Sequence, residues 1–175
     1  MPTSYFIRRL LLTLVLLTSP LLVFAQTKAN LPPALGSAVK SLIAILSDND
    51  TVASSPRLLR TVSLDDGAPD DYALVSFTLS YFDGGNEYFN YLAAFKRSNT
   101  PGSKTQRPRY RLIAAVPVGG KAWRSVDFNH LRYTDGRIEF DTKEYRDHEP
   151  FCCPSKPAKA VYLLDRLSLK EIKTD

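Results

Sequence analysis

The sequence predicts an α+β domain in which one N-terminal amphipathic helix packs on a curled, predominantly antiparallel sheet, and the sheet is expected to curl around the helix. Two observations predict this class. A helical apolar period occurs early in the chain, and from residue 58 onward apolar residues alternate with a period of two. The alternating segments number about seven and are joined mostly by short turns, which leaves no place for the crossover helices of a parallel sheet.

We expect the helix to begin at Pro32 and Pro33, because a proline in the first turn loses no intrahelical hydrogen bond. The polar run of residues 48–50 ends it. Its apolar side chains form a single stripe, which favours packing on the sheet over a membrane-bound or partner-binding helix. The stripe consists of Leu35, Val39, Leu42, Ile43 and Leu46.

Alternation is clearest in a predicted hairpin of residues 73–81 and 89–95, joined by a turn at residues 83–86. The members of one face of its first strand are Ala73, Val75, Phe77, Leu79 and Tyr81. A strand at residues 58–64 precedes the hairpin. The acidic turn at residues 65–70 lies between them and lacks the ligand spacing of a calcium loop.

A strand is predicted at residues 110–116, ending at Pro117, and its Tyr110 and Leu112 are expected to point to the core. In the next predicted strand, residues 122–128, Arg124 and Val126 share a face opposite Trp123. A hairpin with arms at residues 131–133 and 138–140 is predicted around Asp135 and Gly136, and a further strand at residues 158–164. Residues 165–172 fit either a final strand or a short helix.

The N-terminal segment has the pattern of a secretory signal peptide, residues 1–25. Arg8 and Arg9 precede an apolar run over residues 10–24, which is too short and too interrupted for a spanning helix, and cleavage is expected after Ala25. The arginine pair also resembles a twin-arginine signal, but the very apolar run favours the ordinary export route. Residues 26–175 would then be a single exported domain, periplasmic or secreted, with no stable membrane anchor after cleavage.

Cleavage would remove two arginines and no acid, so the net charge would fall from +5 to +3. This charge is too small to predict nucleic acid as a partner. The densest basic patch lies around an expected exposed loop at residues 98–108, where an anionic envelope polymer or lipid head group could bind, although such patches are commonly just solvated surface. Its candidate ligand-binding residues are Lys104, Arg107, Arg109, Tyr110 and Arg111.

Both cysteines of the chain, Cys152 and Cys153, are adjacent. Neighbouring Cα atoms lie about 3.8 Å apart in a trans peptide, below the roughly 4.4 Å minimum of ordinary disulfides, so this pair can join only as a strained vicinal disulfide. Two free thiols, or bonds to another molecule, are the alternatives. If the ring forms, it could offer with Phe151 a flat apolar platform for a ligand; otherwise the segment is a structural loop between strands.

A second interpretation makes this segment a metal site. His148, Cys152 and Cys153 are soft ligands that would suit Cu(I) or Zn(II). Adjacent side chains of an extended strand point to opposite faces, so the two thiolates would need a turn to converge. We therefore favour no metal and expect no cofactor, and a catalytic dithiol is disfavoured because the usual two-residue spacing is absent.

The C-terminal part of the chain contains Ile138-Glu139-Phe140, then Tyr145, then residues 147–155 with Cys152-Cys153-Pro154-Ser155, and then the strand Val161-Tyr162-Leu163. In these residues it resembles a group of exported bacterial proteins that carry a CCPS motif, including the LppP/LprE lipoprotein family. The resemblance implies an exported domain without established chemistry and supplies no catalytic residues. No lipobox cysteine is present here, so a membrane-anchored role does not carry over.

No convergent catalytic set is visible. His130 has Asp127 nearby, but the chain contains no Gly-x-Ser-x-Gly elbow, and a surface or structural histidine is the simpler interpretation. We expect a non-catalytic binding or interaction domain that recognises an unknown envelope component or protein partner. The alternatives are a metal-handling or redox protein using His148 and the cysteines, and an inhibitor or immunity-type protein that blocks a partner enzyme.

Overall fold

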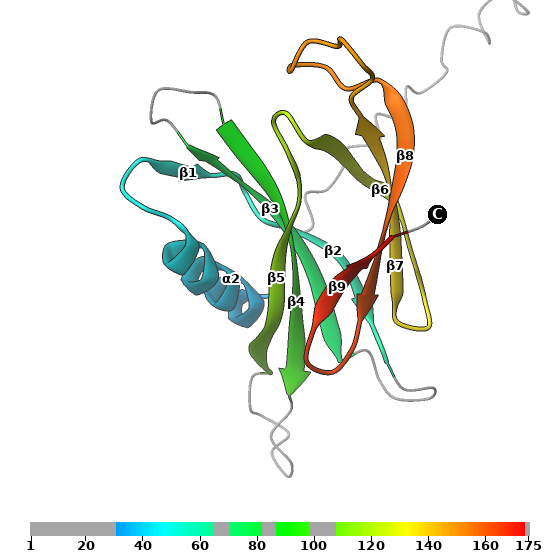
Figure 1. The fold of residues 1–175 in the computed structure, drawn as a ribbon. Coiled ribbons are helices and arrows are strands. Elements are labelled where there is room, and N and C mark those ends of the chain that lie inside the picture. The colour runs from blue at the N-terminus through cyan, green and yellow to red at the C-terminus, as the bar shows by residue number, and fades with distance from the viewer. Residues whose placement is uncertain (1–30, 65–70, 82–86, 99–107, 174–175) are drawn as a thin grey trace, which may run out of the picture.

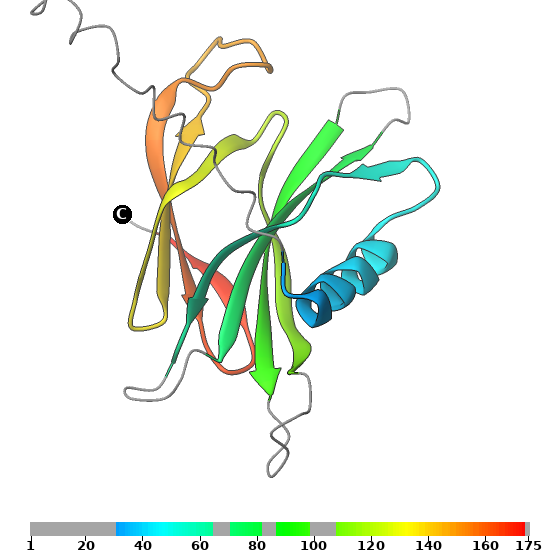
Figure 2. The same ribbon diagram turned by 180° about the vertical axis from the view of Figure 1, so that it is seen from behind.

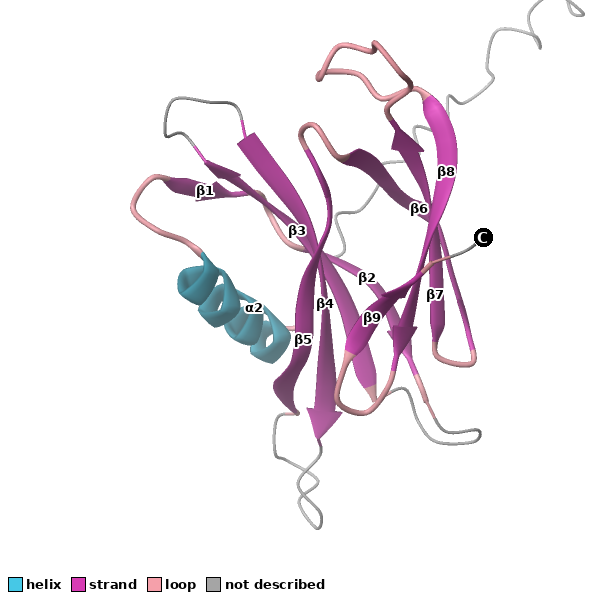
Figure 3. Ribbon diagram, viewed as in Figure 1, coloured by secondary structure: helices cyan, strands magenta, loops and turns pink. Residues whose placement is uncertain are grey.

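The computed structural model describes residues 31–64, 71–81, 87–98 and 108–173. These residues form one helix, α2 (Pro33–Leu46), and nine strands of a single sheet (Figures 1 and 3). The α+β class is therefore confirmed. The strands are β1 (Thr51–Ala53), β2 (Arg57–Val62), β3 (Tyr72–Tyr81), β4 (Glu87–Ser98), β5 (Arg109–Gly120), β6 (Arg124–Thr134), β7 (Arg137–Glu144), β8 (Lys156–Leu164) and β9 (Leu169–Ile172).

All strand pairs are antiparallel, and from β2 to β9 each strand pairs with its neighbour in the sequence. β1 and β2 lie end to end along β3. Between them, the Ser54 amide donates a hydrogen bond to the Thr78 carbonyl oxygen of β3 at 2.9 Å. The described strands number nine rather than about seven. β1 was not predicted, and the open choice for residues 165–172 is decided in favour of a strand, β9.

The sheet folds back on itself without closing, and the larger core lies between its two halves (Figure 1). β5 and β6 share a single register pair, Gly120 with Arg124, and beyond it the two strands diverge. β9 then lies against β5, and β2 against β6. The buried side chains of this core include Leu74, Leu92, Val118, Ile138, Phe140, Tyr162 and Leu164.

Helix α2 lies outside this folded sheet, on the opposite face of β3 and β4 (Figure 2). The prediction of a sheet curled around the helix is wrong. β3 and β4 are apolar on both faces: Phe77 and Phe95 pack against the helix, whereas Leu74 and Leu92 enter the core between the sheet halves. The helix contributes the predicted stripe, of which Leu35, Val39 and Leu42 are buried.

β5 departs from the prediction in two ways. It continues past Pro117 to Gly120, and Leu112, expected in the core, is 40% exposed. The register of the β4–β5 pair shifts between Ala94 and Phe95. Near Leu112, therefore, the side chains of β5 do not alternate regularly between the two faces of the sheet. Glycine is required at position 120, where β5 ends, because a Cβ there would lie 2.5 Å from the Tyr88 carbonyl oxygen.

β6 is one strand where two were predicted. Between Asp127 and Arg132 four residues lie opposite the single residue Phe140, and this bulge breaks the period of two. Phe128 still reaches the core, where its ring centroid lies 4.9 Å from that of Phe140. The predicted hairpin at Asp135 and Gly136 is confirmed, and both residues have positive φ, as this tight turn requires.

A buried arginine ties the two halves of the sheet together. Arg124 is 6% exposed; its Nε donates to the Val118 carbonyl oxygen at 2.6 Å and its Nη2 to the Tyr162 hydroxyl at 2.8 Å. Glu171 of β9 accepts from both terminal nitrogens. Burial raises the pKa of Tyr162 above its ordinary range, so that hydroxyl stays protonated.

The predicted signal peptide and the predicted turns at residues 65–70 and 83–86 lie outside the described residues. Within the part of the chain that the structure describes, no helix has the length and hydropathy needed to cross a bilayer.

Candidate functional site

The loop of residues 145–155 connects β7 to β8, and one carboxylate holds its two ends together. Glu149 Oε2 accepts from the Arg146 amide at 3.0 Å and from the Ser155 amide at 3.2 Å, and Oε1 accepts from the Ser155 hydroxyl. These bonds, led by the Ser155 hydroxyl, hold the pKa of Glu149 below its usual value. The carboxylate is therefore ionised at neutral pH, the form that accepts all three hydrogen bonds.

The tip of this loop presents apolar side chains to solvent. Phe151 is 70% exposed, and Cys152 and Cys153 are also exposed. The Tyr145 hydroxyl donates to the Phe151 carbonyl oxygen at 2.5 Å, and the two rings meet edge to face with centroids 6.3 Å apart. The structure thus positions the three predicted residues Phe151, Cys152 and Cys153 as one exposed surface, which we call the loop tip.

The sulfur atoms of Cys152 and Cys153 lie at disulfide distance, with the Cα atoms 3.8 Å apart. The Cys153 amide donates to the Pro150 carbonyl oxygen at 3.2 Å, so the pair sits in a tight turn. His148 is exposed and has a φ of +68°. Among the described residues, no three His, Cys, Asp or Glu side chains converge on a metal position.

The basic candidates lie at the far end of the β4–β5 hairpin. Arg109 and Arg111 are exposed at the start of β5, and Tyr110 packs partly against the helix-side core. Lys104 and Arg107 lie outside the described residues. The structure adds Lys96 and Arg97 to this region, since Lys96 lies opposite Arg111 and Arg97 lies opposite Tyr110. Their positions depend on strand register, which the sequence alone does not reveal.

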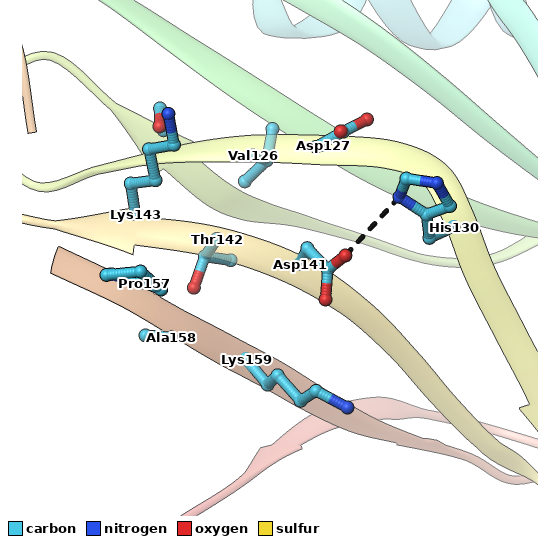
Figure 4. Close-up of a pocket in the computed structure, with 10 residues that line it drawn as sticks. Val126, Asp127, His130, Asp141, Thr142, Lys143, Pro157, Ala158 and Lys159 are labelled. Atoms are coloured by element: carbon cyan, nitrogen blue, oxygen red, sulfur yellow. Dashed lines mark ion pairs between the residues drawn. The ribbon is translucent and has the colours of Figure 1, made fainter. Parts of the chain in front are cut away.

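A third region is an open hollow of about 710 Å³ over β6, β7 and β8 (Figure 4). His130 Nδ1 lies 3.4 Å from Asp141 Oδ2, so the partner of this histidine is Asp141 rather than the nearby Asp127. The bulge in β6 carries His130 over Asp141. Both side chains are well exposed, at 71% and 49%.

The hollow does not assemble a nucleophile and its base. Ser125 lines it, but no hydrogen bond links this serine to His130 within the described part of the chain. The buried hydroxyl of Thr142 has no partner among the described residues, yet Thr142 alternates with Ile138 and Phe140 and so belongs to the core face of β7. The hollow therefore holds the exposed His130–Asp141 pair but, among the described residues, no nucleophile hydrogen-bonded to it.

The resemblance to CCPS-containing exported proteins stays a prediction. The chain matches no protein-family model, no curated protein and no solved structure.

Proposed function

We propose that the protein is a non-catalytic binding domain, exported after loss of residues 1–25, that recognises a protein partner through the loop tip Phe151-Cys152-Cys153. The observation that carries the proposal is an exposed apolar tip on a loop closed by Glu149. Exposed aromatic side chains on ordered supports are typical anchors of protein interfaces.

Order in the loop matters for affinity. Binding by a mobile loop costs the conformational entropy of fixing it, and a loop already closed by hydrogen bonds avoids much of that cost. The contact of Phe151 with Tyr145 supports a defined position for the aromatic ring. The favoured partner therefore offers an apolar cleft that accepts the Phe151 ring and the sulfur atoms beside it.

Site-specific photocrosslinking tests the proposal. A photoreactive phenylalanine analogue placed at position 151 should yield one protein adduct in the exporting cells. Leu167, 78% exposed in the β8–β9 turn, is the matched control, because it is an equally exposed apolar residue away from the loop tip. Adducts at neither position, or the same adducts at both, would refute recognition by the tip.

A second variant separates binding from folding. Phe151→Ser should abolish the adduct formed by a photoreactive residue at the exposed position 147, which keeps both cysteines, while leaving the melting temperature unchanged, because an exposed ring contributes little to the core. If the captured partner is an enzyme, its activity with and without the protein then distinguishes an inhibitor from an adaptor.

A further inference from the structure

The two sulfur atoms of the loop tip form an accessible chemical group whose reactivity differs from that of an ordinary apolar surface. Cys152 and Cys153 are both exposed, and their sulfur atoms lie at disulfide distance. The loop that carries them extends beyond the ends of β7 and β8, outside both hydrophobic cores (Figure 1). Exposed disulfides are the ones most readily reduced, because an attacking thiolate reaches a sulfur atom directly.

The sheet does not need this bond for its stability. A disulfide stabilises mainly by closing a long stretch of chain, and a bond between adjacent residues closes almost none. The chain has only two cysteines, so opening the bond cannot lead to exchange with another pair in the same molecule. Reduction therefore changes the loop tip at little cost to the stability of the fold.

The hydrogen bonds that close the loop are made by other groups. Glu149 accepts from the amides of Arg146 and Ser155. The Tyr145 hydroxyl donates to the Phe151 carbonyl oxygen. Because these contacts do not involve the sulfur atoms, they remain after reduction, and the change is confined to the two cysteine side chains and the peptide between them.

We propose that the Cys152–Cys153 pair is a site of thiol–disulfide exchange, reduced by an exported protein that carries a dithiol, and that its reduction switches off recognition by the loop tip. The switch rests on the proposed function, since it assigns a form of regulation to the same surface. The closed ring fixes both sulfur atoms beside Phe151, whereas two free side chains must be ordered when a partner binds. Only the oxidised tip then presents the rigid surface that the partner recognises.

The exchange balances as a two-electron transfer. One thiolate of the dithiol attacks a cysteine sulfur, the bond between the two cysteines breaks, and the other cysteine leaves as a thiolate that takes up a proton. The second thiolate of the donor attacks the mixed disulfide and releases the remaining cysteine, which is protonated in turn. The products are two thiols on this chain and one disulfide on the donor, so the chain is a substrate of the exchange and not its catalyst.

Intact mass tests the exchange. The folded, oxidised protein is incubated without denaturant with reduced thioredoxin, and should gain two hydrogens and two alkylatable thiols while its melting temperature stays unchanged. Cys152→Ser/Cys153→Ser is the control for mass and alkylation, because it holds no sulfur to reduce. The proposal would be overturned by thiols that are free before the dithiol is added, by a bond that resists the dithiol in the folded protein, or by a lower melting temperature after reduction.

Photocrosslinking from position 147 in extracts of the exporting cells tests the switch, because a photoreactive residue there keeps both cysteines. The adduct yield should fall roughly ten-fold when dithiothreitol reduces the protein, and by a similar factor in Cys152→Ser/Cys153→Ser without reductant. The serine variant separates the opening of the ring from any effect of the reductant on the partner.

The outcomes distinguish the switch from the recognition on which it rests. Equal adduct yields in the oxidised protein, the reduced protein and the serine variant would overturn the switch and leave recognition by the tip intact. A loss in only one of the two open forms would also overturn the switch, since ring closure would not be the cause. Absence of a specific adduct in all three would refute recognition by the tip, and the switch with it.

Discussion

Arg124 and Glu171 are joined by two parallel contacts, Nη1 to Oε1 at 2.5 Å and Nη2 to Oε2 at 3.0 Å. The guanidinium also lies over the Trp123 ring, 4.5 Å from its centroid. Arg124 belongs to β6 and Glu171 to β9, so the pair connects strands that do not pair with each other in the sheet. A planar guanidinium with two donors aimed at one carboxylate gives this connection a fixed geometry.

Removing the arginine should destabilise the protein strongly. Arg124→Met removes the guanidinium from the Glu171 carboxylate and from the Tyr162 hydroxyl oxygen, and leaves the carboxylate with the Tyr162 hydroxyl at 3.1 Å as its donor. The substitution should lower the free energy of unfolding by roughly 3 kcal/mol. Urea denaturation measures this. Lys159→Gln, in an exposed ion pair, is the control and should cost less than about 1 kcal/mol. Equal effects of the two substitutions would contradict a structural role for the Arg124–Glu171 pair.

The contribution of Glu171 should disappear in acid. Burial alone would raise the pKa of Glu171, but the hydrogen bond from Arg124 outweighs it and holds the pKa below its ordinary value of 4.5. A carboxyl whose pKa is lower in the folded state stabilises above the ordinary pKa and loses that effect as pH falls through the folded value. The stability gap between wild type and Glu171→Gln should therefore shrink below pH 4.5, as chemical denaturation across that range would show. A gap that does not change with pH would contradict the ion pair.

Two glycines should respond to alanine in opposite directions. Gly136 has a φ of +79°, and a Cβ there would lie 2.9 Å from the Leu164 carbonyl oxygen, so Gly136→Ala should cost roughly 1–3 kcal/mol. Gly36 lies in α2 with no atom nearer than 3.9 Å to an added Cβ, so Gly36→Ala should stabilise by about 1 kcal/mol. Thermal unfolding tests both, and destabilisation by Gly36→Ala would contradict the placement of that helix.

Loss of the Glu149 carboxylate should loosen the loop without unfolding the sheet. In Glu149→Ala, the amides of Arg146 and Ser155 lose their acceptor and should exchange hydrogen roughly ten-fold faster. Asp147→Asn changes a neighbouring acid for which the structure gives no hydrogen bond, and should leave the exchange of both amides unchanged. Unaltered exchange in Glu149→Ala would show that the loop is closed by other contacts.

The cysteine pair should be oxidised in the exported protein. The intact mass is expected to lack residues 1–25 and to fall two hydrogens below the dithiol value, with no alkylation until a reductant is added. Cys152→Ser/Cys153→Ser provides the unreactive control. Two alkylated thiols without reduction would refute the vicinal disulfide, and a mass that retains residues 1–25 would refute cleavage.

Helix α2 and the hairpin of β3 and β4 were predictable because their periods are uninterrupted. The position of the helix could not be predicted, because β3 and β4 carry apolar side chains on both faces. The sequence pattern assigned only the face that contains Phe77 to the protein core. The continuity of β6 was missed for a related reason. Its bulge brings both Phe128 and Leu131 against the core, although a strict period of two would put them on opposite faces.

Only those features of the site that lie in consecutive residues could be predicted. The adjacent cysteines beside Phe151 are visible directly in the amino-acid sequence. The role of Glu149 depends on the path of the loop back to Ser155, and the nearness of Lys96 to Arg111 depends on register; neither follows from composition or spacing. The pairing of His130 with Asp141 likewise needs the bulge.

The sequential pairing of β2 to β9 bears on how fast the chain folds. Each hairpin requires closure of a short loop, whereas the meeting of β9 with β5 and of β2 with β6 joins distant parts of the chain. Short closures cost little entropy and occur early. We therefore expect the rate-limiting event to be the collapse of two preformed halves around Leu92 and Phe140, with mutations there slowing folding more than mutations in the hairpin turns.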